Sequence, residues 1–265
     1  MNASMGIQQL KYLKILLIGD SCIDRYHYGT CDRMSPEAPV PVFKVSHTEN
    51  QDGMALNVKS NLEGLGVKVD ILTNAEEIVK VRHIDMKSRQ HLLRVDWGEE
   101  KAVQPLSPDL LDDIDFELYD GVVISDYDKG LITPAVIGKI LNRCDNKPIF
   151  VDSKKNDLSP YEGCILKINE KERREAQKLP SKCELIVTLG ERGASYQGRE
   201  FATKKVEIFD VCGAGDTFLA GLSSAFLLTQ DMGRAIIFAN LCGGVAVQKF
   251  GTYTVKQEDL YDLYI

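Results

Sequence analysis

Residues 213–216 combine a turn of small residues with a carboxylate, in the sequence Gly-Ala-Gly-Asp. The β-branched residues within 206–211 predict a buried strand before this turn, and apolar residues at helical spacing from Phe218 onward predict a helix that begins at or beside Asp216. A strand, a glycine turn and a helix start together direct backbone N–H groups towards an anion. Asp216 would lie beside that anion as a carboxylate that can accept a proton.

An anion site beside a base suits the transfer of a phosphoryl group from ATP to a hydroxyl. This reaction requires charge stabilisation on the γ-phosphoryl group and a group that accepts the hydroxyl proton. A purely structural interpretation is also open, because Asp is a common N-cap and Gly-x-Gly before a helix is often only a turn. Motifs elsewhere in the chain are needed to distinguish a phosphoryl-transfer site from a purely structural turn.

The length and composition fit one α/β domain. The chain has 265 residues, of which 44% are apolar, and this is enough for a sizeable core. Its net charge of −7 argues against a broadly basic surface, so we expect neither nucleic acid nor an anionic membrane as a partner. An anionic substrate would need basic residues that are placed locally.

The cysteine pattern and the N-terminus indicate a cytoplasmic protein. The seven cysteines are scattered without a Cys-x-x-Cys pair, and the four histidines do not complete a zinc-binding spacing. Residues 1–12 lack the apolar core of a signal peptide, and no apolar run is long enough to span a membrane. We therefore expect reduced thiols and a cytoplasmic location.

Apolar strands alternate with helical patterns along the chain, which predicts an α/β fold with a doubly wound, mostly parallel sheet. The expected strands are 14–18, 67–72, 119–126, 148–152, 164–169 and 184–189, and the expected helices are 53–66, 134–144, 216–230 and 232–248. Ligands bind at the carboxyl ends of strands in such sheets. Asp20 and Asp24 follow the first strand; Asp20 can equally be a loop cap, whereas Asp24 would point into the crevice.

Two regions outside this pattern predict smaller β structures. Prolines 36, 39 and 41 exclude a helix and a central strand, so we expect a proline-stiffened surface loop over 26–42. The segments 43–47, 78–82 and 91–96 alternate polar and apolar residues, as half-exposed strands do.

These motifs together resemble the ribokinase, or PfkB, family of carbohydrate kinases. Residues 210–216 are similar to that family's Asp-Thr-x-Gly-Ala-Gly-Asp signature, residues 169–172 to its Asn-x-x-Glu motif, and residues 53–66 to its Gly-Gly…Asn substrate helix. The likeness covers nearly the whole chain. Within the family, the chain is most similar to kinases of D-glycero-D-manno-heptose 7-phosphate, mainly through the Ser-Pro-Glu-Ala-Pro-Val-Pro run at 35–41.

The resemblance implies a ribokinase-like fold. The chain would form a single kinase domain over residues 1–265, with a lid of β-strands at about 33–48 and 78–97. In this family such a lid often pairs between subunits, so a homodimer through the lid is expected.

The resemblance also implies roles for individual residues. Asp216 would be the base, and Gly213, Ala214 and Gly215 would supply N–H groups to the transferring phosphoryl group. The sugar hydroxyls would be bound by Asp24, Gly53 and Asn57. The remaining assignments concern ATP and Mg²⁺: Asn169, Thr188, Gly190 and Asn240 would bind ATP, and Glu172 would bind the metal through water.

A sugar phosphate would need cations in or near the lid. Arg33, Arg82 and Arg89 are the candidates, together with Lys44 and Arg94, because a guanidinium matches a phosphate as a bidentate donor. Each of them can also be a solvated surface residue.

The chain departs from the family pattern in three places. Met54 replaces the second Gly of the substrate helix and could reshape the sugar pocket. The chain passes almost directly from the strand that ends near Thr73 to the lid at Lys80, so some tens of residues of a usual family member are missing. Cys212 replaces a Thr, which is a mild change.

The expected activity is therefore transfer of the ATP γ-phosphate, with Mg²⁺, to the 1-hydroxyl of D-glycero-D-manno-heptose 7-phosphate. No nucleotidyltransferase half follows Ile265, so we expect a later activation step to belong to another protein. Two alternatives stay open: a related kinase for another sugar phosphate or a nucleoside, and a non-catalytic relative that binds a sugar or a nucleotide.

Overall fold

The computed structural model describes residues 3–99, 103–144 and 146–261. Its main sheet has eight strands in the order β12-β11-β10-β9-β8-β7-β1-β4. The strands from β10 to β4 are parallel, whereas β11 and β12 are antiparallel additions at one edge. The bounds are β1 (Lys14–Gly19), β4 (Lys68–Leu72), β7 (Gly121–Asp126), β8 (Ile149–Ser153), β9 (Ile165–Asn169), β10 (Glu184–Thr188), β11 (Ala194–Tyr196) and β12 (Arg199–Phe201).

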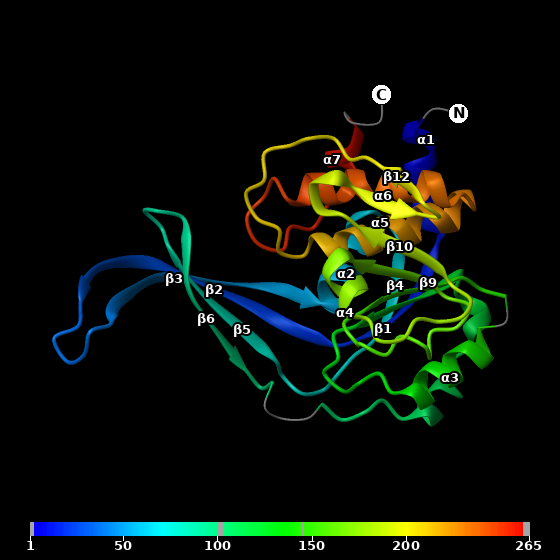
Figure 1. The fold of residues 1–265 in the computed structure, drawn as a ribbon, viewed down its shortest axis with the longest axis horizontal. Helices are drawn as coiled ribbons and strands as arrows, with labels where there is room; N and C mark the ends of the chain where they lie inside the picture. The colour runs from blue at the N-terminus through cyan, green and yellow to red at the C-terminus, as the bar shows by residue number, and fades with distance from the viewer. Residues whose placement is uncertain (1–2, 100–102, 145, 262–265) are drawn as a thin grey trace.

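Helices cover both faces of this sheet, as Figure 1 shows. One face packs against α2 (Ala55–Gly64), α5 (Ala214–Thr229) and α6 (Met232–Ala246), and the other against α3 (Pro134–Arg143). Ile15 and Leu17 of β1 belong to the first apolar cluster, and Leu16 and Ile18 belong to the second. A strand that is buried on both sides needs a continuous apolar run, so the doubly wound sheet predicted from the sequence is confirmed.

The remaining helical elements are short and lie between the larger ones. They are α1 (Ala3–Gln8), η1 (Gln9–Tyr12), η2 (Pro108–Leu111), η3 (Phe116–Leu118), α4 (Glu170–Glu175), η4 (Gly190–Arg192) and α7 (Glu258–Tyr261). No helix in the described part of the chain has both the length and the apolar character needed to span a bilayer.

A second sheet, the lid sheet, extends away from the main body (Figure 1). Its order is β3-β2-β5-β6, with β2 and β5 parallel and the outer pairs antiparallel. The bounds are β2 (Ser21–Met34), β3 (Pro41–Met54), β5 (Val79–Asp85) and β6 (Gln90–Trp97). A separate small sheet agrees with the lid that the resemblance implies.

The lid sheet differs from the expected segments in its first half. It begins at Ser21 and continues to Met54, so the surface loop predicted over 26–42 is wrong for most of its length. The prolines explain the difference, because two of them lie in the short loop between β2 and β3 and Pro41 is the first residue of β3. Proline is tolerated at the first position of a strand, so these prolines mark where the two strands end and begin and do not exclude a hairpin.

The strand predicted over 206–211 is also wrong. These residues form an irregular segment in which Ile208 is 48% and Val211 67% exposed. Both side chains line a cavity instead of facing a neighbouring strand. A β-branched pattern does not distinguish a buried strand from a segment that presents apolar side chains to a pocket.

The connection between the main sheet and the lid is short. β4 ends at Leu72 and β5 begins at Val79, so the direct passage predicted from the sequence is present. β4 is consequently the last strand at its edge of the main sheet.

Candidate active site

Asp216 lies in the first turn of α5 and is only 3% exposed. Its Oδ1 accepts a hydrogen bond from the Tyr127 hydroxyl at 2.7 Å, and its Oδ2 accepts one from Asn57 Nδ2 at 3.0 Å. Burial raises the pKa of Asp216 to about 6, although these two hydrogen bonds lower it. A carboxylate with this pKa is ionised at neutral pH and still basic enough to accept a proton.

The glycines before Asp216 leave room for two polar side chains. Gly213 has a left-handed φ of 73°, and a Cβ there would be 2.5 Å from Asn57 Nδ2. A Cβ on Gly215 would be 2.9 Å from the Nζ of Lys167. The left-handed φ thus favours glycine at position 213, and the missing side chain at both positions allows a polar group to approach closely.

Four charged side chains lie beside the turn. Asp152 accepts from Lys167 at 2.6 Å and from Lys154 at 3.0 Å, and Lys154 also contacts Glu172 Oε1 at 2.7 Å. Burial opposes ionisation of Asp152, but the two lysines outweigh it and hold its pKa below the ordinary value. Lys167 is 2% exposed. The sequence predictions missed the lysines, although a lysine inside the apolar run 164–168 was a usable signal.

Asn169 and Glu172 form a capping box at the start of α4. The Asn169 side chain accepts from the Glu172 N–H, and Glu172 Oε2 accepts from the Asn169 N–H, both at 2.8 Å. Both carboxylate oxygens of Glu172 therefore already have a protein donor. Within the described residues no group of three acidic, histidine or cysteine side chains could hold a metal directly. This donor set fits a metal that keeps its water and is bound mainly by phosphates, as Mg²⁺ commonly is.

Asp24 of β2 and Arg82 of β5 form a buried ion pair within the lid sheet. Arg82 Nη1 contacts Asp24 Oδ1, and both residues are at least 92% buried, with exposures of 4% and 8%. Arg82 Nη2 also lies 3.6 Å from Cys212 Sγ, next to the Gly213 turn. A Cβ on Gly53 would be 2.6 Å from Asp24 Oδ2, so this glycine lets the strand approach the carboxylate. The structure thus brings Asp24, Gly53 and Arg82 together close to the turn.

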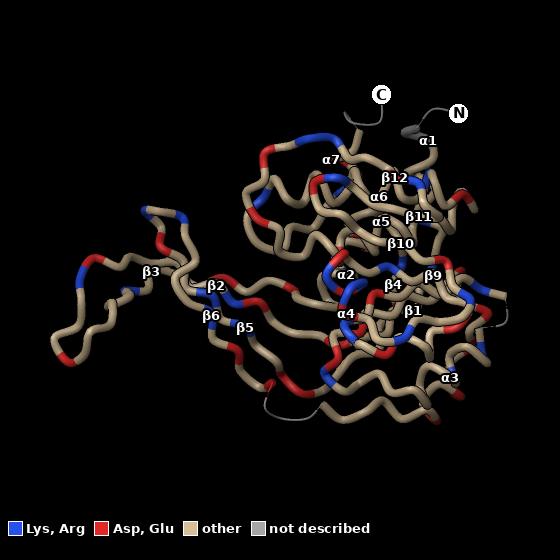
Figure 2. The backbone as a smooth tube through the Cα atoms, viewed as in Figure 1, with Lys and Arg blue, Asp and Glu red and all other residues tan. Residues whose placement is uncertain are grey.

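Arg33 and Arg89 lie away from the turn and from Asp24. Arg33 is an exposed residue near the end of β2, and Arg89 is an exposed residue of the turn between β5 and β6. Both strand pairs extend outward from the main body, where residues of both charge signs are interspersed (Figure 2). Within this chain the two arginines are therefore apart from Asp216.

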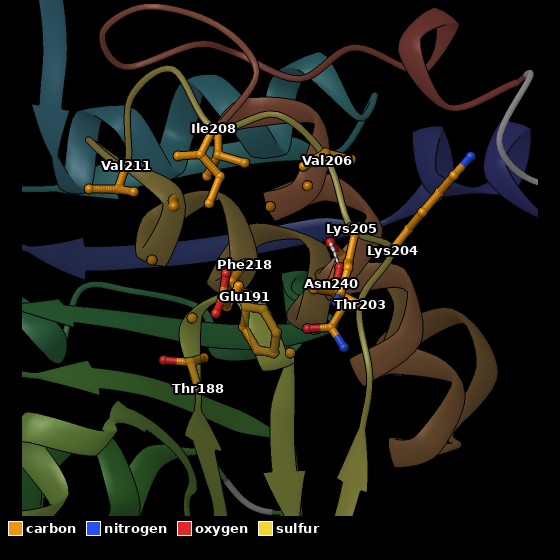
Figure 3. Close-up of a pocket in the computed structure, with 17 residues that line it drawn as sticks. Thr188, Glu191, Thr203, Lys204, Lys205, Val206, Ile208, Val211, Phe218 and Asn240 are labelled. Atoms are coloured by element: carbon orange, nitrogen blue, oxygen red, sulfur yellow. Dashed lines mark hydrogen bonds between the residues drawn. The ribbon is translucent and has the colours of Figure 1, made fainter.

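A cavity of about 340 Å³ lies on the other side of the turn. Thr188, Gly190 and Asn240, which the sequence assigns to the nucleotide, line it together with Ala214 and Gly215. Figure 3 shows Val211 and Ile208 on one side of it and Thr188 on the other, with Phe218 between them. The sequence predictions missed the apolar lining.

Hydrogen bonds fix part of the cavity wall. Asn240 Nδ2 donates to the carbonyl of Phe201 at 2.8 Å, and the Thr203 hydroxyl donates to the Asn240 carbonyl. The side chain of Asn240 thus ties α6 to the end of β12. Asn169 does not belong to the lining and caps α4 nearby.

The sequence is similar to curated bacterial proteins. It is 35% identical to the bifunctional protein HldE of Nitratiruptor over 297 positions, which cover 93% of this chain and 64% of that relative. It is 33% identical to the bifunctional protein HldE of Campylobacter curvus, over 96% of this chain and 65% of the relative. The chain therefore spans less than two thirds of the length of these relatives. The first alignment is longer than this chain, so the relative contains residues that the chain lacks.

The fold is similar to that of solved ribokinases. The Arabidopsis thaliana ribokinase complexed with ribose and ATP matches with a TM-score of 0.67 at 15% identity, over 95% of this chain and 98% of that one. The Thermotoga maritima ribokinase matches with a TM-score of 0.63 at 17% identity, over 95% and 99% of the two chains.

A family profile described as pfkB family carbohydrate kinase matches residues 163–259, which contain α4, α5, α6 and most of the cavity. The sequence relatives, the ribokinase fold and this profile agree with the resemblance seen in the motifs. In its sequence and in this profile, the chain is thus similar to the pfkB family of carbohydrate kinases.

Proposed function

We propose that the protein is an ATP-dependent kinase that phosphorylates the 1-hydroxyl of D-glycero-D-manno-heptose 7-phosphate. The product would be the 1,7-bisphosphate, a precursor for nucleotide-activated heptose in lipopolysaccharide-type glycans. The observation that carries the proposal is the buried Asp216 carboxylate, with a cavity on one side of its turn and the polar side chains of the lid on the other. The similarity to HldE proteins supports the choice of a heptose phosphate.

The reaction can be derived from the side chains around Asp216. The sugar hydroxyl would donate its proton to Asp216, while Asn57 and Tyr127 hold the carboxylate in place. The N–H groups of the turn, with Lys154 and Lys167 beside it, would stabilise the negative charge on the phosphoryl group during transfer.

The bound nucleotide would occupy the cavity lined by Thr188, Gly190 and Asn240, with its phosphates directed towards Gly215. Apolar side chains such as Val211 would contact the base. We propose that Glu172 and Asn169 organise Mg²⁺ through water, and that Mg²⁺ would neutralise charge on the phosphates of ATP.

The sugar would lie between the turn and the lid sheet, where Asp24, Gly53 and Asn57 are close enough to contact its hydroxyls. Arg82 neutralises Asp24, so we assign Arg82 to positioning that carboxylate in addition to substrate contact. We assign the reaction to the cytoplasm, because ATP is available there and all seven cysteines are free thiols.

One observation favours a different acceptor. Met54 has φ 55° and ψ −129°, a conformation that glycine adopts readily and other residues rarely do, and its side chain is 3% exposed at the start of α2. Its buried side chain belongs to the apolar cluster that contains Ile18 and Cys22, directly beside Gly53, where a glycine would leave space. A smaller sugar phosphate or a nucleoside is therefore the second candidate substrate.

Phosphorus NMR of the protein with MgATP tests both candidates. D-glycero-D-manno-heptose 7-phosphate should give a new anomeric phosphate signal, whereas fructose 6-phosphate and ribose should give none. Turnover of a control sugar alone would support kinase activity and reject the heptose phosphate as the substrate. The Asp216→Asn variant should lose about 10²–10⁴-fold in kcat, because it lacks the base. Wild-type turnover by this variant would reject the mechanism.

A matched control is Asp231→Asn, since Asp231 caps α6 away from the turn and Asn caps a helix equally well. The pH profile gives a further check. Only the ionised carboxylate accepts a proton, so kcat/KM should rise with pH and level off above about pH 6. A flat profile down to pH 4 would contradict the raised pKa of Asp216.

We also propose that the protein forms a homodimer through the lid sheet. Val45, Leu93 and Trp97 of this sheet are 52%, 57% and 61% exposed, and exposed apolar residues on an extended sheet indicate an interaction surface. Sedimentation velocity should give twice the mass of one chain, and a monomer at micromolar concentration would contradict the proposal.

A further inference from the structure

Two lysines converge on one carboxylate at the junction between the lid sheet and the main body. Lys80 of β5 lies with its Nζ 3.6 Å from Glu99 Oε1, and Lys129, in the loop after β7, lies with its Nζ 2.9 Å from the same oxygen. Among the residues that the structure describes, this oxygen is buried and has no hydrogen-bond partner with good geometry. The two ammonium groups thus share one carboxylate oxygen of Glu99.

The surroundings hold the two lysines in place. Asp20 is fully buried, and its Oδ2 accepts from the backbone N–H groups of Tyr127 and Lys129, at 2.8 and 3.3 Å. Asp96 pairs with Lys80 in the lid-sheet register, but its two carboxylate oxygens already accept from Arg94 at 2.7 and 2.6 Å. In the described part of the chain, Glu99 is therefore the carboxylate within ion-pair distance of both ammonium groups.

Tyr127 relates this pair to the reacting centre. The Nζ of Lys80 lies 5.9 Å from the centroid of the Tyr127 ring, and the hydroxyl of the same ring donates to Asp216. One aromatic ring and two contacts thus separate the ammonium of Lys80 from the base. A heptose has a comparable separation between its anomeric hydroxyl and a phosphate on its last carbon.

We infer that Lys80 and Lys129 bind the terminal phosphate of the sugar substrate, and that Glu99 occupies the position of this phosphate when no substrate is bound. The inference rests on the proposed function for the identity of the sugar. A phosphate offers three acceptor oxygens and nearly two negative charges, so it satisfies two ammonium groups better than one carboxylate does.

This assignment differs from the one based on the sequence. Arg82 forms an ion pair with Asp24, and Arg33 and Arg89 lie on the outer part of the lid sheet. Lys80 and Lys129 instead share one carboxylate at the base of the lid sheet, and Lys80 contacts the Tyr127 ring that donates to Asp216.

The test is a pair of Lys→Gln substitutions at Lys80 and Lys129, made singly and together, assayed with D-glycero-D-manno-heptose 7-phosphate and with the unphosphorylated heptose. Each substitution should raise KM for the 7-phosphate about 10-fold or more, because each removes a hydrogen bond between charged groups. Both kcat and KM for ATP should stay within about three-fold of wild type, as should KM for the unphosphorylated sugar.

Lys87→Gln is the matched control, because Lys87 pairs with Asp32 at the exposed end of the lid sheet. It should leave both KM values unchanged. Glu99→Gln should lower KM for the 7-phosphate, since it removes the competing carboxylate. An equal rise of KM for both sugars in the Lys80 and Lys129 variants, or no rise, would overturn the inference.

Binding of inorganic phosphate, measured by calorimetry, separates failure of the inference from failure of the proposed function. If the wild-type protein does not turn over the heptose phosphate, the proposed function fails. The phosphate site then still predicts weaker phosphate binding in the double variant than in the wild type and in Lys87→Gln. Equal binding in all three proteins would reject the site itself.

Discussion

The two sides of the Asp216 turn differ in the kinds of group that form them. On the cavity side, backbone groups, glycines and apolar side chains such as Ile208 and Val211 form most of the wall. Away from the apolar wall, ion pairs lie beside the base, namely Asp24 with Arg82 in the lid sheet and Asp152 with Lys167 in the main sheet. The same helix start separates these two environments.

The difference fits the ligand that we propose for each side. Shape and backbone contacts suffice for a flat, largely apolar base, and they tolerate many side chains. A polyhydroxylated, anionic substrate and a transferring phosphoryl group need charges at fixed positions, and buried charges are stable only when they are paired. Substitutions on the two sides should therefore change different kinetic constants.

Of the two substitutions that test this comparison, the larger effect is expected for Lys167→Met on the charged side. This change leaves buried Asp152 with Lys154 as its partner, so the free energy of unfolding should fall by about 3 kcal/mol. The loss of a cation next to Gly215 should also lower kcat by about 10-fold or more. Urea unfolding and steady-state kinetics measure both effects.

The control for this change is Lys171→Met, which alters an exposed lysine of α4. It should leave stability and kcat close to wild type. If Lys167→Met changed the dissociation constant of ATP as strongly as kcat, the expectation that the two sides control different constants would be contradicted.

A smaller effect is expected for Gly243→Ala on the cavity side. The new Cβ would lie no closer than 4.0 Å to its nearest neighbour, the carbonyl oxygen of Ala214, so α6 should gain about 0.5–1 kcal/mol from the loss of a helical glycine. The methyl group would enter the cavity, so KM for ATP should rise several-fold while kcat stays nearly constant.

Gly138→Ala in α3 is the matched control, because a Cβ there meets no atom within 4 Å and the position is outside the cavity. It should give a similar gain in thermal stability with an unchanged KM for ATP. An equal KM in the two variants would show that the cavity does not bind the nucleotide.

Much of the fold follows from patterns within single segments. The central strands are continuous apolar runs because both of their faces are covered, and the start of α5 at Ala214 follows from the small residues before Asp216. Loop 35–40 was harder to delimit, since proline indicates where a strand cannot continue without showing how far it has already run.

The charged side of the site could be predicted only in part. Asp24 and Arg82 meet because β2 and β5 pair in parallel. The two residues are 58 positions apart, and such a register is set by the fold as a whole. Lys167 and Asp152 likewise meet across neighbouring strands. The cavity wall at 206–211 was mistaken for a strand, because periodicity reports apolar character and not the partner that covers it.

The short passage from β4 to β5 has a consequence for how the protein behaves in a crowded solution. β4 is an edge strand of the main sheet, and the free backbone groups of an edge strand can pair with a strand of another molecule. This strand is only five residues long, and two of its side chains, Lys68 and Asp70, are charged and exposed. Asp70 is further held in place by Lys14 and by the Tyr119 hydroxyl, at 2.7 and 2.8 Å. The edge strand β4 thus carries charges that discourage strand-by-strand aggregation.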